Sequence, residues 1–62
     1  MTNNTKKMLF NEASEAANRA SAAALSVNEA IQAGQGREAY NALIDSMAAA
    51  AKLEARMSVL TT

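Results

Sequence analysis

Apolar residues in the first half of the chain recur at alternating steps of three and four positions. This spacing is the heptad pattern of a helix that packs one face against a partner. Residues 5–33 contain nine alanines and no glycine or proline, so the pattern predicts one long helix over this range. The apolar series consists of Phe10, Ala13, Ala17, Ala20, Ala24, Val27 and Ile31. A second apolar row lies beside this series, on one side of it only, and consists of Leu9, Ala16, Ala23 and Ala30.

The second half of the chain repeats the pattern. Residues 37–60 again lack glycine and proline, which predicts a second helix over this range. Its apolar series has the same alternating steps and consists of Ala39, Leu43, Ser46, Ala50, Leu53, Met57 and Leu60. Ser46 is the one polar member of this series. We expect it to bond a main-chain carbonyl or to permit close packing of the helices.

Two glycines separate the predicted helices. Gly34 can adopt the left-handed conformation that commonly ends a helix, and Gly36 adds a second permissive position, so residues 34–36 form a tight turn. A short turn makes the helices antiparallel. The predicted fold class is therefore all-α, with a single domain over residues 1–62 folded as an antiparallel two-helix hairpin with an alanine-rich heptad contact. Residues whose numbers add up to about 70 then face each other, and the helices must approach closely where alanines meet.

The composition limits the core that this hairpin can build. Half of the residues are hydrophobic, but 16 of these 31 are alanine, which leaves 15 larger apolar side chains. A single core in a chain of this length rarely supplies more than ~3–5 kcal/mol, and the chain has no cysteine for a disulfide. We therefore expect self-association into a helical bundle, which for a dimer of hairpins would have four helices.

Several apolar residues lie at the margins of the predicted contact or outside it. Isolated exposed apolar residues are ordinary on protein surfaces, but Ile44, Ala48 and Ala51 follow helical spacing on one flank of the second helix. Such a flank suits an interface with another copy or with a partner protein. The residues that we assign to an oligomer or partner interface are Phe10, Leu25, Ile44, Met47, Ala51 and Val59.

The residue inventory argues against catalysis. Without histidine or cysteine the chain can form no Ser-His-Asp triad, no thiolate nucleophile and no zinc finger, so we expect no enzyme, no cofactor and no metal site. The longest apolar run, residues 47–51, is far too short to cross a membrane. The apolar stretch after Lys6 and Lys7 is also too short for a secretion signal. We expect a cytoplasmic protein, with a composition compatible with phage or plasmid origin.

One charged cluster offers an alternative function. The hairpin brings Arg19, Lys52 and Arg56 to a similar level, and Tyr40 could stack on a ligand ring. These four residues are the candidates for a phosphate or nucleotide site. Glu15 and Glu54 lie among these bases, however, and the net charge of the chain is zero. The interpretation that we favour is a solvated surface whose charges compensate each other.

Two functional hypotheses follow. The first is a non-enzymatic interaction protein that oligomerises through amphipathic helices and binds a partner protein in order to regulate, inhibit or scaffold it. The alternative is an oligomeric bundle that binds or sequesters nucleotides or nucleic acid through a repeated basic and aromatic site. A third option, an amphipathic helix that lies on a membrane surface, ranks last because the polar faces carry few lysines and arginines.

Overall fold

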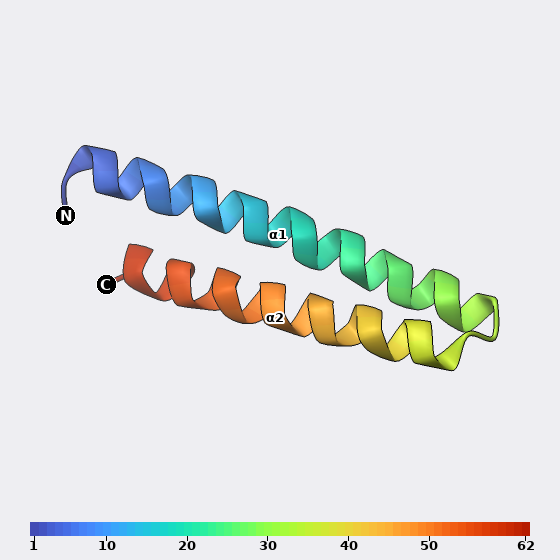
Figure 1. Ribbon diagram of the computed structural model, residues 1–62. Helices are drawn as coiled ribbons and strands as arrows, with labels where there is room; N and C mark the ends of the chain where they lie inside the picture. Colours follow the sequence, from blue (N-terminus) through green and yellow to red (C-terminus); the bar gives the residue numbers. More distant parts are fainter.

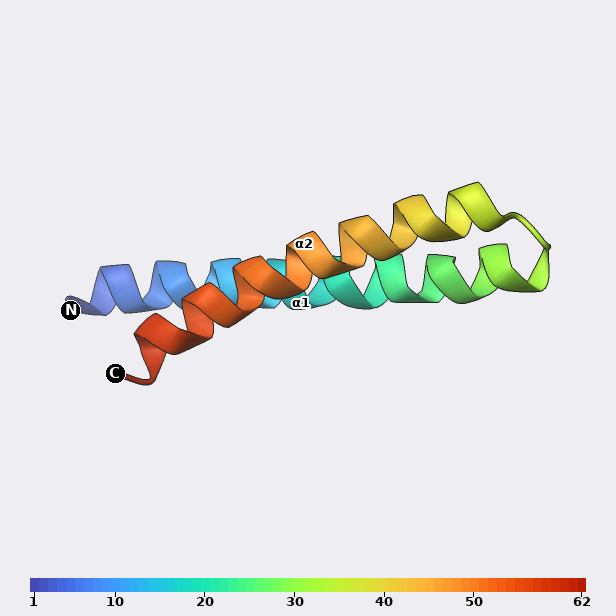
Figure 2. The same ribbon diagram turned by 90° about the horizontal axis from the view of Figure 1, so that it is seen from below.

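The computed structural model describes residues 1–62 and consists of two antiparallel helices joined by a tight turn (Figure 1). Helix α1 spans Asn3–Gln32 and helix α2 spans Gly36–Leu60. The predicted all-α hairpin is confirmed, and the helix bounds differ from the expected ones by no more than two residues. The hairpin is a narrow rod of 48 × 14 × 12 Å, and the two helices cross at a shallow angle (Figure 2).

Helix α1 begins two residues earlier than expected because Thr2 caps it. The Thr2 Oγ1 accepts a hydrogen bond from the main-chain N–H of Thr5 at 3.1 Å, which satisfies one of the free donors of the first turn. The adjacent residues Asn3, Asn4 and Thr5 also carry side-chain oxygens of the kind that cap helices. The choice of Thr2 adds Asn3 and Asn4 to the helix.

The turn has the conformation that the glycines predict. Gly34 has a φ of +72°, in the left-handed region, and is the only residue with a positive φ. The N–H of Gln35 donates to the carbonyl oxygen of Ala30 at 2.8 Å, and that of Gly34 donates to Ile31 at 3.0 Å. This pair of bonds is the Schellman motif that ends a helix and reverses the chain. Gln35 is the N-cap residue of α2. Its side chain makes no capping bond, and its carbonyl accepts the first helical hydrogen bond, from the N–H of Ala39.

The core between the helices is made of alanine alone. The buried residues are Ala13, Ala16, Ala23, Ala30, Ala39 and Ala49. No larger side chain is fully buried, although Leu9, Val27, Leu53 and Leu60 are half-buried at the margins. The two helices therefore meet through their smallest side chains.

The contact faces are rotated relative to the prediction. On α1 the helices meet through the row that contains Ala16, Ala23 and Ala30, whereas Phe10 and Ile31 of the expected series are 53% and 60% exposed. Small side chains explain this rotation, because alanine lets two backbones approach and gain more van der Waals contact than phenylalanine or isoleucine would.

Helix α2 shows the same rotation. Its contact face includes Ala42, Ala49 and Arg56 in place of Leu43, Ala50 and Met57, which are exposed. Ser46 and Leu53 stay at the contact as expected. The expected antiparallel arrangement is thus confirmed, but in each helix one predicted row of contact residues is wrong and the row beside it is used.

The predicted close approach is visible in one hydrogen bond. The Ser46 Oγ donates to the main-chain carbonyl oxygen of Ala20 on the opposite helix at 3.2 Å. A serine side chain is short, so it reaches the backbone of a neighbouring helix only where the two helices nearly touch. The expectation that Ser46 bonds a main-chain carbonyl is confirmed.

Candidate functional site

Two ion pairs lie along one side of the hairpin. The Arg19 guanidinium donates to Asp45 Oδ1 from Nη2 at 2.8 Å and from Nε at 3.0 Å. The Arg56 Nε donates to Glu12 Oε1 at 2.9 Å. Each pair joins α1 to α2. We call this side of the rod the charged face, and it consists of Glu12, Arg19, Asp45, Lys52 and Arg56.

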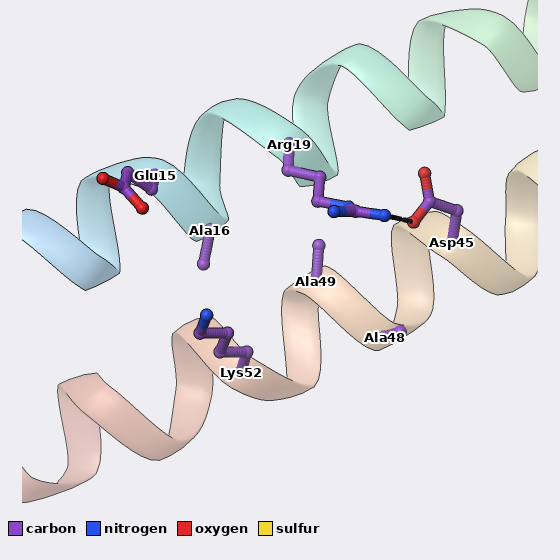
Figure 3. Close-up of a pocket in the computed structure, with 7 residues that line it drawn as sticks. All are labelled: Glu15, Ala16, Arg19, Asp45, Ala48, Ala49 and Lys52. Atoms are coloured by element: carbon purple, nitrogen blue, oxygen red, sulfur yellow. Dashed lines mark hydrogen bonds and ion pairs between the residues drawn. The ribbon is translucent and has the colours of Figure 1, made fainter.

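A shallow groove of about 260 Å³ lies between the helices on this charged face. Figure 3 shows Arg19 reaching across it to Asp45, with Glu15 and Lys52 further along. The groove is lined by Glu15, Ala16, Arg19, Asp45, Ala48, Ala49 and Lys52. Its walls carry two positive and two negative side chains over a floor of alanine, so the groove has no net charge.

The structure brings together only part of the basic cluster that the sequence suggested. Arg19 and Lys52 line the same groove, but Arg56 is bound to Glu12 outside it. Tyr40 is 63% exposed and is not among the groove residues. Arg19 pairs with Asp45 across the hairpin instead of with Glu15 one turn earlier on its own helix. Both arginines therefore have carboxylate partners, which agrees with a surface whose charges compensate each other.

The opposite side of the hairpin is apolar. At 100° per residue, Glu12 and Arg19 lie on one flank of the buried alanines of α1, whereas Phe10 and Ile31 lie on the other. On α2 the row that contains Leu43 and Met57 lies on the flank away from Asp45 by the same geometry. We call this side the apolar face, and it consists of Phe10, Ala17, Ala24, Ile31, Leu43, Ala50 and Met57.

The apolar face is, on each helix, the row that contributes least to the contact inside the hairpin, with Leu43 and Met57 still 42% and 40% exposed. Three adjacent rows are apolar on α1, and three are apolar on α2 apart from Ser46 and Arg56, but contact with a single neighbour needs only two rows. The third rows of α1 and α2 lie on the same side of the molecule and carry no charge. Tyr40 and Met47 extend this side along the outer edge of α2, and both are exposed.

The structure separates the residues that we assigned to an interface. All six are exposed, but only Phe10 belongs to the apolar face, with Met47 beside it. Ile44 and Ala51 lie on the back of α2, away from α1, and Leu25 lies on the back of α1. Val59 follows Asp45 and Lys52 by heptad steps, so it lies on the flank of α2 that bears the charges.

The heptad pattern predicts Ile31, Leu43 and Met57 inside the hairpin, but all three are exposed. The one-sided row of Leu9, Ala16, Ala23 and Ala30 was a signal for the actual contact face. A row of four residues that holds three alanines packs more closely than a row that ends in phenylalanine and isoleucine.

Searches against protein-family models, curated proteins and solved structures gave no match to this chain. Neither α1 nor α2 contains an apolar stretch that could span a membrane. No three side chains among histidine, cysteine, aspartate and glutamate come together in a way that could hold a metal ion. The candidate site is therefore characterised by its surfaces alone: one apolar face and one charged face with a shallow groove.

Proposed function

We propose that this chain is a cytoplasmic, non-enzymatic interaction protein that self-associates through its amphipathic helices and binds a partner protein to regulate, inhibit or scaffold it. The observation that carries the proposal is the exposure of the large apolar side chains. Eleven of the fifteen are exposed and none is fully buried. A monomer with an alanine-only core gains little from burial, whereas contact with another helical surface would bury these side chains.

The partner surface that we propose is the back of α2. Ile44 and Ala51 are exposed there, on the side that faces away from α1, and Met47 lies at its edge. An amphipathic helix is recognised through apolar anchors at helical spacing, and Ile44, Met47 and Ala51 have the steps of three and four that such recognition uses.

The test is a pull-down from host-cell lysate with the immobilised chain, compared between wild type, Ile44→Glu and Leu25→Glu. Both substitutions place a carboxylate at an exposed apolar position, but only the first lies on α2. We expect one specific partner to be retained by the wild type and by Leu25→Glu and lost from Ile44→Glu. A folded wild-type protein that retains no specific partner, or a partner that ignores Ile44→Glu, would contradict the proposal.

A second candidate function has one observation in its favour. Arg19 and Lys52 line the same groove, which supports a bundle that binds nucleotides or nucleic acid. The carboxylates of Glu15 and Asp45 in that groove weaken this candidate because they repel phosphate. Titration of nucleotides and RNA at increasing salt tests it, since phosphate contacts weaken steeply as salt rises. An absence of binding at low salt would eliminate it.

A further inference from the structure

We infer that the apolar face is covered by a second copy of this chain, so that two hairpins pack face to face into a four-helix bundle with both charged faces turned outward. This inference rests on the proposed function and names the occupant of one of its surfaces. It assigns self-association to the apolar face and leaves the back of α2 for the partner protein.

The surface area of the hairpin supports a second copy as the occupant. A compact monomer of 6.5 kDa would expose roughly 3,800 Å² according to the usual scaling of surface with mass. The hairpin exposes 4567 Å². The excess is roughly 750 Å², which is close to the ~800 Å² that each partner buries in a standard stable interface. One symmetric interface of ordinary size would therefore reduce the exposed surface area of each chain to that of a compact protein of the same mass.

The arrangement of the rows points to a bundle of four helices. In such a bundle each helix contacts two neighbours, so it needs a wider apolar stripe than a helix with a single neighbour. Helices α1 and α2 each have one unused apolar row, and the two unused rows lie on the same side of the hairpin. A second hairpin placed on that side gives both helices their second neighbour at once.

The charges support the same orientation. Both ion pairs lie on the opposite side, so a face-to-face dimer would leave Arg19–Asp45 and Glu12–Arg56 in solvent. The apolar face has no charged member, and the closest is Glu54, in the row beside it. Dimerisation through this side therefore desolvates no ion pair, whereas dimerisation through the charged face would have to bury two.

The face also suits a copy of itself in shape. Its bulky residues lie towards the two ends, with Phe10 and Met57 nearer the termini and Ile31 and Leu43 nearer the turn. Ala17, Ala24 and Ala50 occupy the middle. A two-fold axis through this middle would let two hairpins approach through small side chains, while the larger side chains fill the space between the helices at both ends.

The experiment is sedimentation equilibrium of the full chain, compared between wild type, Leu43→Glu and Leu25→Glu. The two variants introduce the same change at exposed leucines, one on the apolar face and one on the back of α1. We expect wild type and Leu25→Glu to have twice the 6.5 kDa chain mass. For Leu43→Glu we expect a dimer dissociation constant raised by about tenfold or more, because its carboxylate would be buried in the interface.

Ile31→Glu is the second variant, since Ile31 is more exposed than Leu43 and contributes less to the hairpin itself. Circular dichroism at high protein concentration identifies any variant that has lost its helices, and the other variant then decides. A wild-type chain that stays monomeric at about 1 mM, where even a weak dimer forms, would overturn the inference. Equal dimerisation of the wild type and both apolar-face variants would also overturn it. Loss of the dimer in Leu25→Glu alone would do the same.

This test and the capture experiment can fail separately. A monomeric wild type that still captures a protein through Ile44 would overturn the dimer inference and leave partner binding standing. A dimer that captures nothing would support the inference and contradict partner binding.

Discussion

The hydroxyl of Ser46 donates to the carbonyl oxygen of Ala20 across the hairpin at 3.2 Å, and this bond marks the close contact of α1 with α2. A larger side chain at Ser46 would have to push the helices apart or leave its preferred rotamer. The same serine is the only polar residue in the apolar series of α2. Its small size and its hydrogen bond thus serve one purpose, which is to hold two alanine-lined helices together.

We predict that Ser46→Leu destabilises the hairpin by ~1–3 kcal/mol, the usual cost of overpacking. Ser58→Leu is the matched control, because Ser58 is exposed on the same helix and its replacement should change stability only by a few tenths of a kcal/mol through helix propensity. Thermal melts at one protein concentration measure the difference, since the midpoint of an oligomer depends on concentration. Equal midpoints for the two variants would show that the helices are not in close contact at Ser46.

The two glycines of the turn should respond differently to the same substitution, with only Gly34→Ala lowering stability. Gly34→Ala forces a side chain into a left-handed conformation, at a cost of ~1–2 kcal/mol. Gly36 is the first residue of α2, and an added Cβ there meets no atom within 4 Å beyond its own stretch of helix backbone. Gly36→Ala should leave stability unchanged or raise it by ~0.4–1 kcal/mol, because alanine restricts the unfolded chain.

Chemical denaturation of the two alanine variants checks this prediction, since the free energies of unfolding can be compared directly if the slopes agree. A Gly34→Ala variant as stable as wild type would mean that the chain reverses without the left-handed residue. A loss of stability in Gly36→Ala would indicate a contact at the start of α2 that the hairpin itself lacks.

The ion pair of Arg56 should contribute more to stability than that of Arg19. The side chains of Arg56 and Glu12 are 32% and 37% exposed, whereas those of Arg19 and Asp45 are 70% and 43% exposed. Exposed pairs contribute ~0–1 kcal/mol and are screened by salt. Arg56→Met should therefore lower the melting temperature more than Arg19→Met, and added salt should reduce the smaller effect of Arg19→Met further. The reverse order would contradict this assignment.

The sequence predicts the helices and the turn well because local chemistry determines them. Long ranges without glycine or proline give two helices, and Gly34 supplies the one conformation that the reversal needs. Which face of each helix forms the contact depends on more than polarity. On α1 three adjacent rows are apolar, so polarity alone does not select the contact, and the smaller side chains of the row of Ala16 and Ala23 favour it over the row of Phe10.

The ion pairs are a second feature that the sequence does not predict. Glu15 lies one turn before Arg19 on the same helix, so local spacing favours their pairing. Arg19 instead reaches Asp45, which is 26 positions away along the chain. A long side chain at the edge of the helix contact can reach either a local or a distant carboxylate. Which one it pairs with depends on how both helices are rotated.

The rotated contact face of α1 gives the last prediction, which concerns the neighbours Ala22 and Ala23. Ala23 is 6% exposed against α2, whereas Ala22 is exposed. Ala23→Leu should overpack the alanine core and cost ~1–3 kcal/mol, a large share of the stability of so small a domain. Ala22→Leu makes the same change in solvent and should alter stability by only a few tenths of a kcal/mol. Thermal melts at matched concentration should separate the two variants by several degrees, since ~1 kcal/mol shifts the midpoint by about 4–8 °C in a domain of this size. If both variants melted together, the row of Ala23 would not be the contact, and the row of Phe10 and Ala24 that the heptad pattern predicts would be the alternative.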